Sequence, residues 1–435
     1  MSFTSIIWLL IVFAGLSFCF AKDPFYGLLT YIFVYFLAPT SSINWWAVDI
    51  PDLMWSFLTA VILLISCFIH KEQLSEIKLG SIAPGKWLIA FLVLSVFVSF
   101  FAVNQERSFR RCNDLFRIII IFYIIIKCIK KEQQLEYTIL LILLCGFFLG
   151  YQAYNTPRYG GRLEGVGTLD TSDANDFALL LATIIPFGFP LLFSANKYIR
   201  YSVIPCFAFI FNGIVLCNSR GAILSIAVSG LVTIFLVKIP KIKIKIIVAG
   251  IIFVCAFVYL ADDVFWERFR TIEKSTQTDK GSGRLTTWLE GLQIAKDYPF
   301  GTGGDGFQVL SPYYITNLTE GKRSAHNTYL LVLVEQGALG LIIFLCLNLN
   351  ILIILRKGRK LILLKRDANQ IDEGDRFLYL TNIALSAALA GHLTGAIFGS
   401  RLYYGYYYFI ISMSVATTYL AEIKSDNFKL LQKEI

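Results

Sequence analysis

Three side chains suited to proton transfer and anion binding stand in the polar segments of an otherwise apolar chain. His326 lies where this segment, residues 261 to 327, ends; Arg284 lies near its middle, and Arg220 lies in an earlier polar corner. A neutral imidazole accepts a proton near physiological pH. A guanidinium binds two phosphate oxygens at once, which a lysine ammonium cannot do. These residue types predict proton abstraction beside a bound phosphate.

Each of the three residues also has a structural interpretation. A lone histidine more often serves as a core or capping group, and Arg284 can simply cap or solvate the helix that follows it. For His326, the neighbouring Arg323 disfavours the charged imidazole, which favours a role as a base. Asn327 follows the histidine, and Trp288 lies one helical turn after Arg284, so both are further candidates for substrate binding.

Arginine, rather than lysine, occupies the short loops on one side of the predicted membrane. Lysine-rich loops are expected in the cytoplasm, at Lys127 to Lys131, Lys197 to Arg200, Lys238 to Lys245, Arg356 to Arg366 and Lys424 to Lys429. The opposite loops carry Arg107, Arg110, Arg111, Arg158, Arg162, Arg220 and Arg401. Arg162, Arg323 and Arg401 are therefore candidate phosphate ligands. The alternative is that most of these arginines reach toward lipid headgroups or pair with Asp114, Glu164 or Asp170.

Metal chemistry has weak support in the sequence. The pair Asp262 and Asp263 could hold a divalent ion, but the outer loops contain no Asp-x-Asp, and the chain has three histidines and scattered single cysteines. The cluster from Asp170 to Asp176 is explained equally well by capping of the helix that follows Asp173. We expect no metal and no cofactor.

The composition places these residues on a membrane protein. Of the 435 residues, 56% are hydrophobic and 16% are charged, and the mean hydropathy is +0.65, which is too apolar for a soluble chain of this length. Apolar runs long enough for membrane helices are predicted at 4–21, 25–39, 53–69, 87–103, 115–129, 136–151, 176–193, 200–217, 221–237, 245–260, 327–355, 377–398 and 402–422. We therefore predict an all-α polytopic membrane protein with about 12 to 13 transmembrane helices.

The polar segment divides this bundle in the sequence. We expect residues 1–260 to form the N-terminal transmembrane helices, residues 261–326 an extracytoplasmic loop or lid between the tenth and eleventh spans, and residues 327–435 the C-terminal transmembrane helices. Within the loop, Leu285, Trp288, Leu289 and Leu292 recur at helical spacing and predict an amphipathic helix over 284–296 that lies along the outer membrane surface or caps the bundle.

A glycine-rich run, Pro299 to Gly306, follows this helix and formally matches Gly-x-Gly-x-x-Gly. It has no preceding strand, so a dinucleotide site is not expected. We predict a turn whose backbone approaches a ligand or a neighbouring segment.

Several of these motifs together resemble the O-antigen ligase and polymerase family. They are Ser219-Arg220-Gly221, Gly283-Arg284-Leu285 with Trp288, the Pro299 to Gly303 turn, and Ser324-Ala325-His326-Asn327-Thr328-Tyr329 followed by Glu335, Gly337 and Gly340. The resemblance covers residues 170 to 360 closely. The stretches Asp23 to Gly27 and Asp173 to Phe177 look like the branch of the family encoded with exosortase systems.

The resemblance implies a metal-independent glycosyltransferase on the periplasmic face of a bacterial inner membrane. Its expected partners are an undecaprenyl-diphosphate-linked glycan as donor, a glycan, lipid A core or protein as acceptor, and membrane lipids; no nucleic acid is expected. By this resemblance His326 matches the essential histidine of the family, and Arg220 and Arg284 match its two essential arginines. An O-antigen ligase-like, inverting transfer to an acceptor hydroxyl follows, with His326 as general base.

Other functions stay open on the sequence alone. The same chemistry would serve an O-antigen-type polymerase or a protein O-oligosaccharyltransferase. A polytopic transporter or lipid flippase also has many spans, but transporters place polar groups at the membrane midplane, whereas this chain concentrates them on one side. A catalytically inert assembly protein is the third alternative.

Overall fold

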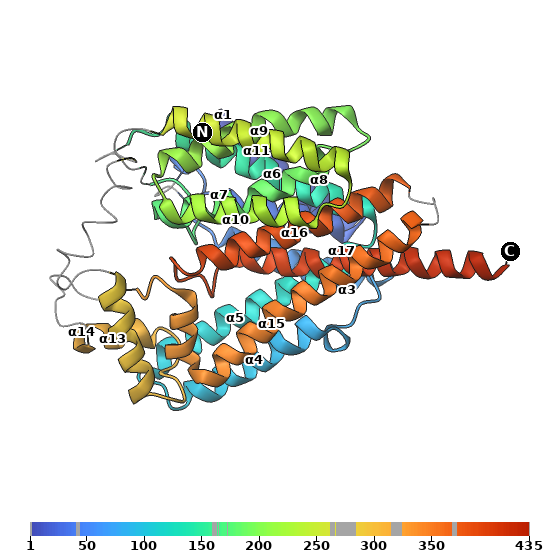
Figure 1. The fold of residues 1–435 in the computed structure, drawn as a ribbon. Coiled ribbons are helices and arrows are strands. Elements are labelled where there is room, and N and C mark those ends of the chain that lie inside the picture. Colours follow the sequence, from blue (N-terminus) through green and yellow to red (C-terminus); the bar gives the residue numbers. More distant parts are fainter. Residues whose placement is uncertain are drawn as a thin grey trace.

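A computed structural model describes residues 2–40, 44–158, 163, 165–171, 173–261, 266, 284–314, 324–367 and 372–434. In these ranges every regular element is a helix (Figure 1). The predicted all-α polytopic membrane fold is confirmed, because seven of these helices are long and apolar enough to cross a membrane.

The helices before the polar segment have the following bounds: α1 Phe3–Ala21, α2 Pro24–Phe36, α3 Trp55–Ile69, α4 Ala83–Ser99, α5 Gln105–Cys128, α6 Glu132–Asn155, α7 Ala174–Ile184, α8 Gly188–Leu191, α9 Lys197–Leu216, α10 Arg220–Leu236 and α11 Pro240–Leu260. The later helices are α13 Arg284–Asp297, α14 Gly306–Tyr314, α15 Thr328–Asp367, α16 Glu373–Gly395 and α17 Gly405–Glu434.

Each predicted span coincides with one of these helices or with a short series of them. The run 176–193 contains α7, the 3₁₀ turn Ile185–Phe187 and α8, since Pro186 and Pro190 interrupt the regular hydrogen bonding. α5 begins well before its predicted span. Its charged first half was excluded by hydropathy, yet Asn104 caps it and starts the helix there.

α16 lies at the centre of the bundle, and α11 lies at its edge. α16 packs against α7, α10, α15 and α17, and most of its residues are buried. In α11 only Ile242 is buried. α7 and α10 both pack directly on the central helix α16.

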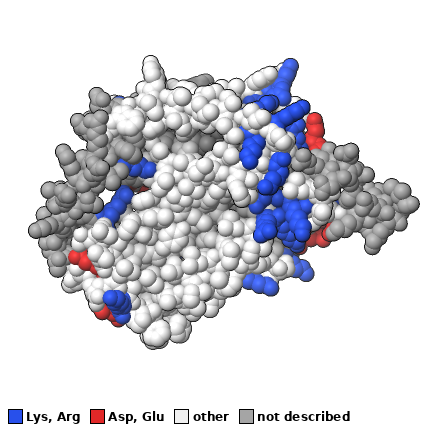
Figure 2. Space-filling model, in the orientation of Figure 1, with Lys and Arg blue, Asp and Glu red and all other residues white. Residues whose placement is uncertain are grey.

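The two ends of the bundle differ in charge. Figure 2 shows most of the visible Lys and Arg side chains gathered at the end where α15 finishes and α17 projects. The opposite end carries α13 and α14. This separation matches the predicted division between lysine-rich loops and the loops that carry single arginines.

The predicted amphipathic helix is present as α13. It packs through Thr287, Gly291 and Ile294, while Leu285 and Leu289 are mostly exposed. A methyl group at Gly291 would collide with Leu330 and Phe307, so the glycine permits close packing on α15 and α14. The leucine stripe is thus turned away from the protein, as expected for a helix at the membrane surface.

The glycine-rich turn packs against a kink in α15. Gly337 interrupts α15 with φ 67° and ψ −175°. The amide of Gly303 donates to the carbonyl of Glu335 at 3.0 Å, and the amide of Thr302 donates to that of Val334 at 2.9 Å. Gly301, with φ 100°, lies against the same carbonyl of Glu335. The turn therefore approaches a neighbouring helix.

Candidate functional site

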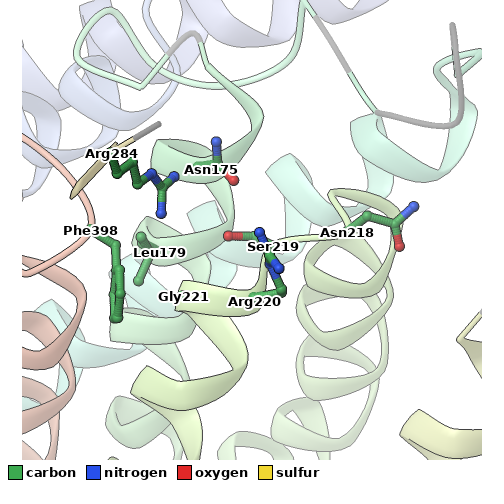
Figure 3. A pocket seen from close by; sticks show the side chains of 8 residues that line it. All are labelled: Asn175, Leu179, Asn218, Ser219, Arg220, Gly221, Arg284 and Phe398. Carbon is green, nitrogen blue, oxygen red and sulfur yellow. The ribbon is translucent and has the colours of Figure 1, made fainter. Parts of the chain in front are cut away.

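One pocket of about 130 Å³ lies at the α13 end of the bundle (Figure 3). Its walls come from α7, the corner before α10, the start of α13, and the turn between α16 and α17. The lining residues are Asn175, Leu179, Asn218, Ser219, Arg220, Gly221, Arg284 and Phe398. Residues that are far apart in the chain therefore meet here.

Local backbone geometry positions the Arg220 wall. Asn218 has φ 50° in the left-handed region, which a non-glycine residue adopts at some cost in strain, and α10 begins two residues later. Gly221 lies next to Phe398, since a Cβ added there would be in ordinary van der Waals contact, 3.4 Å from the Cβ of Phe398. This sharp entry into α10 places Arg220 in the pocket wall.

The pocket combines two guanidinium groups with neutral polar side chains. Arg220 and Arg284 are both exposed, and Figure 3 shows their guanidinium groups on either side of the space that also borders Leu179. Asn175 and Ser219 add an amide and a hydroxyl, and no lining residue is acidic. This arrangement favours an anion with several oxygen atoms.

His326 is exposed and does not line the pocket. Its φ of 46° places it, like Asn218, in left-handed backbone just before a helix. The preceding Ala325 accepts a hydrogen bond at 3.2 Å from the indole of Trp288, and the hydroxyl groups of Ser324 and Ser400 lie 2.9 Å apart. The histidine is therefore tied to α13, which carries Arg284, and to the turn that carries Phe398.

The start of α15 is fixed to the same turn. The Thr328 amide donates to the Ala396 carbonyl at 2.8 Å, and its hydroxyl donates to the Gly399 carbonyl at 2.6 Å. The side chain of Asn327 accepts from the Leu330 amide at 3.1 Å and so caps the helix. Asn327, which we predicted to bind substrate, therefore has a structural contact in this conformation.

Arg401 lies behind the pocket wall and does not line it. Its side chain is fully buried and forms an ion pair of 2.8 Å with Asp176, which also accepts from Tyr404 at 2.8 Å. Burial opposes the charge on Arg401, but Tyr406 and Asp176 outweigh this effect and raise its pKa. The amide of Arg401 donates to the Thr328 hydroxyl at 3.0 Å. This placement favours a role in holding α7 against the start of α15.

Other arginines at this end are paired with acids. Arg110 lies 2.8 Å from Glu106, and Arg111 lies 2.8 Å from Asp305 and 3.3 Å from Asp114. The Asp114 pairing was one of those predicted. Arg162 and Arg323, predicted to bind substrate, lie outside the described residues, as do Glu164, Asp262 and Asp263.

Asn175, Leu179 and Phe398 are pocket residues that sequence reasoning missed. Asn175 follows Asp173, whose carboxylate caps α7 by accepting from the amides of Asn175 and Asp176. That capping was anticipated, but the side of α7 that meets α10 was not. Phe398 gave no signal, since an aromatic residue near the end of an apolar span is ordinary.

The site suits anion binding better than cation binding. In the described ranges, no group of three or more His, Cys, Asp or Glu side chains is placed to hold a metal ion. His392, the other histidine near this end, is buried and stacks on Tyr407 at a centroid distance of 4.6 Å. Of these two histidines, His326 is the exposed one.

Comparison with known proteins agrees with the motifs. Residues 205–345 match the family model described as O-antigen ligase. No curated protein matches the chain. The matched range contains Arg220, Arg284 and His326, and it includes both the turn at Pro299 to Gly306 and the Gly337 kink. The predicted resemblance is thereby confirmed over residues 205–345 of this multi-pass membrane protein, the range that matches the O-antigen ligase family.

Proposed function

We propose that this protein transfers a glycan from undecaprenyl diphosphate to an acceptor hydroxyl, with Arg220 and Arg284 as ligands of the diphosphate. The observation that carries the proposal is that these two arginines, distant in sequence, line one pocket without an acidic side chain among its lining residues. The match to the O-antigen ligase family supports the reaction class.

The two guanidinium groups would act on the leaving group. As the bond between the anomeric carbon and the diphosphate oxygen breaks, its electron pair and negative charge pass to the diphosphate. Fixed donors aimed at a developing charge lower the barrier, and removing one such donor costs about a hundred- to a thousand-fold in rate. Arg220 and Arg284 would supply these donors without a metal ion.

His326 would accept the acceptor's proton. The acceptor hydroxyl oxygen attacks the anomeric carbon from the face opposite the diphosphate, which inverts the configuration, and its proton passes to the imidazole. The exposure of His326 and its ties to α13 and to the α16–α17 turn support this role. The residues just before His326 contact the helix that carries Arg284 and the turn that carries Phe398, and we propose that the sugar and the acceptor bind between His326 and the pocket.

The pocket end would face the periplasm of a bacterial inner membrane. Lysine and arginine gather at the other end, which the positive-inside rule places in the cytoplasm (Figure 2). The polyprenyl tail would remain among membrane lipids, while the acceptor, a glycan, lipid A core or protein, would approach from the periplasm.

The test is transfer from a purified undecaprenyl-diphosphate-linked glycan by the purified protein. With the true acceptor among the three classes, wild type forms product. His326→Ala lowers the rate about a hundred- to ten-thousand-fold, as expected for loss of a general base. Arg220→Gln and Arg284→Gln each lower it about a hundred-fold or more.

Two matched variants control for general damage. Arg110→Gln removes an arginine at the same end that is paired with Glu106, and His70→Gln removes a histidine outside the pocket. Both should retain wild-type rates. Normal transfer by the His326, Arg220 and Arg284 variants, at equal protein levels, would rule out the proposed site.

A further inference from the structure

Ser219 occupies an unusual position for a serine at the start of a helix. It is the N-cap residue of α10, where a serine hydroxyl normally accepts from an amide in the first turn. Here the side chain makes no capping hydrogen bond. Its hydroxyl is buried, with the residue 1% exposed, and it has no hydrogen-bond partner among the described residues. A buried hydroxyl without a hydrogen-bond partner costs free energy unless a ligand supplies that partner.

The hydroxyl of Ser219 faces the pocket. Ser219 lines it together with Arg220 and Gly221, and Figure 3 shows its side-chain oxygen directed toward the space between Arg284 and Leu179. The same space receives the N-terminus of α10, a helix of 17 residues. Amide groups in the first turn of a helix lack intrahelical acceptors, and the helix dipole adds positive potential there.

The second helix that reaches the pocket is already capped. The carboxylate of Asp173 accepts from the first-turn amides of α7 at Asn175 and Asp176. An anion in the pocket is therefore drawn to α10 rather than α7. At α10 it meets a hydroxyl donor and a helix N-terminus, next to Arg220 and opposite Arg284.

We infer that Ser219 and the first turn of α10 bind an oxygen of a diphosphate, with the Ser219 hydroxyl as a specific donor beside the two arginines. This inference rests on the proposed function, because it assigns a further contact in the same pocket. It explains why the serine leaves its own helix uncapped: the ligand oxygen takes the place that the cap would fill.

Binding measurements on the purified full-length protein in detergent test the inference. The probes are inorganic pyrophosphate and farnesyl diphosphate, with sulfate as a general anion. Ser219→Ala should weaken binding of both diphosphates about ten-fold or more, as expected for loss of a hydrogen bond to a charged group. Ser219→Thr keeps the hydroxyl and should bind within about two-fold of wild type.

Ser219→Asp separates anion binding from helix capping. Aspartate caps a helix as well as serine does, so the fold should tolerate it, and unchanged diphosphate binding would show that the anion does not lie at this end of α10. Our inference predicts that binding is lost, because the carboxylate takes the place of the phosphate and repels it, while the Tm does not fall. Ser225→Ala is the matched control, since this buried α10 hydroxyl bonds to the Gly221 carbonyl within the helix.

The outcomes distinguish the inference from the function on which it rests. If wild type binds diphosphate and Arg220→Gln weakens binding, but Ser219→Ala and Ser219→Asp do not, the serine inference alone is wrong. If wild type binds neither diphosphate better than sulfate, the proposed function fails as well. Tighter binding of farnesyl diphosphate than of pyrophosphate supports a lipid-borne ligand, and equal affinity assigns the site to the free anion.

Discussion

At the level of single residues, the arginines at the pocket end divide into two groups. Arg110, Arg111 and Arg401 form ion pairs with acidic side chains, whereas Arg220 and Arg284 line a pocket that has no acid in its wall. The sequence predicted phosphate binding for Arg401 as well as for Arg220 and Arg284, and it left pairing with acids open for most of the loop arginines. Among the described arginines, Arg220 and Arg284 are the two that line the pocket.

The difference between these groups could not be obtained from sequence. Arg220 and Arg284 were identified through short local motifs, which a sequence displays directly. The partner of Arg401 is Asp176, and that of Arg111 is Asp305; both lie far away along the chain. Such pairs depend on the packing of α5, α7 and the later turns, which local patterns do not encode.

Asp170 provides a pH-dependent prediction at this scale. Its carboxylate accepts from Tyr35 at 2.6 Å and from the Gly405 amide at 3.1 Å, and burial raises its pKa. A raised native pKa means that the fold favours the protonated acid. The protonated Asp170 carboxyl therefore stabilises the fold fully at a pH below the pKa of an aspartate in the unfolded chain, about 3.9. This stabilisation is lost as the pH rises through the pKa of Asp170 in the folded protein.

Asp170→Asn removes this titration while keeping an oxygen acceptor. We expect the Tm of the variant to vary less between pH 4 and pH 8 than that of wild type, with equal or higher stability at the alkaline end, as read by thermal unfolding in detergent. Asp173→Asn is the control, because asparagine caps a helix equally well. An unchanged pH profile for Asp170→Asn would contradict the assignment.

At the level of elements, the membrane helices were predictable, but their mutual contacts were not. Long apolar runs identify a helix without knowledge of its neighbours, so a helix is found at each predicted span, and seven of the described helices are long and apolar enough to cross a membrane. The α13 helix was also predicted from its spacing. Its leucine stripe did not reveal that Thr287, Gly291 and Ile294 form the buried side, because the stripe follows the membrane and not the protein core.

The Gly337 kink gives the prediction at this scale. Its φ of 67° is strained for any side chain, and an added Cβ would lie 2.8 Å from the backbone at Pro299 and Phe300. Gly337→Ala should therefore cost about 2 kcal/mol or more, from left-handed strain and overpacking. The measurement is the Tm and the amount of folded protein in the membrane.

Gly250→Ala in α11 is the matched control. A Cβ at Gly250 meets nothing within 4 Å, and alanine is the better helix former, so its stability should equal or exceed that of wild type. A Gly337 variant as stable as the Gly250 variant would show that the turn and the kink do not depend on each other's close approach.

At the level of the whole molecule, the bundle has one lysine-rich end and one end with the pocket (Figures 2 and 3). The proposed periplasmic orientation predicts the labelling of new cysteines. Gln105→Cys at the start of α5 should react with a membrane-impermeant maleimide in intact spheroplasts. Gln133→Cys near the start of α6 should react only after permeabilisation, because the span predicted from the sequence at 115–129, in the second half of α5, would cross the membrane between them.

The native protein is the control for this experiment, since Cys255 is its one exposed cysteine in the described residues and belongs to an apolar span. It should remain unlabelled in intact spheroplasts. The opposite labelling of the two new cysteines would show that the protein has the reverse orientation in the membrane. The pocket would then face the cytoplasm, where a periplasmic acceptor could not reach it.

The pocket is assembled from four separate segments, and this bears on the biosynthesis of the protein. Its walls include Asn175 early in the chain and Phe398 near its end. Chains emerge from the ribosome N-terminus first, so Arg220 enters the bilayer long before the turn bearing Phe398 has been translated. A nascent or truncated polypeptide therefore lacks a wall of the cavity, and the cavity is complete only once the last two helices have been inserted.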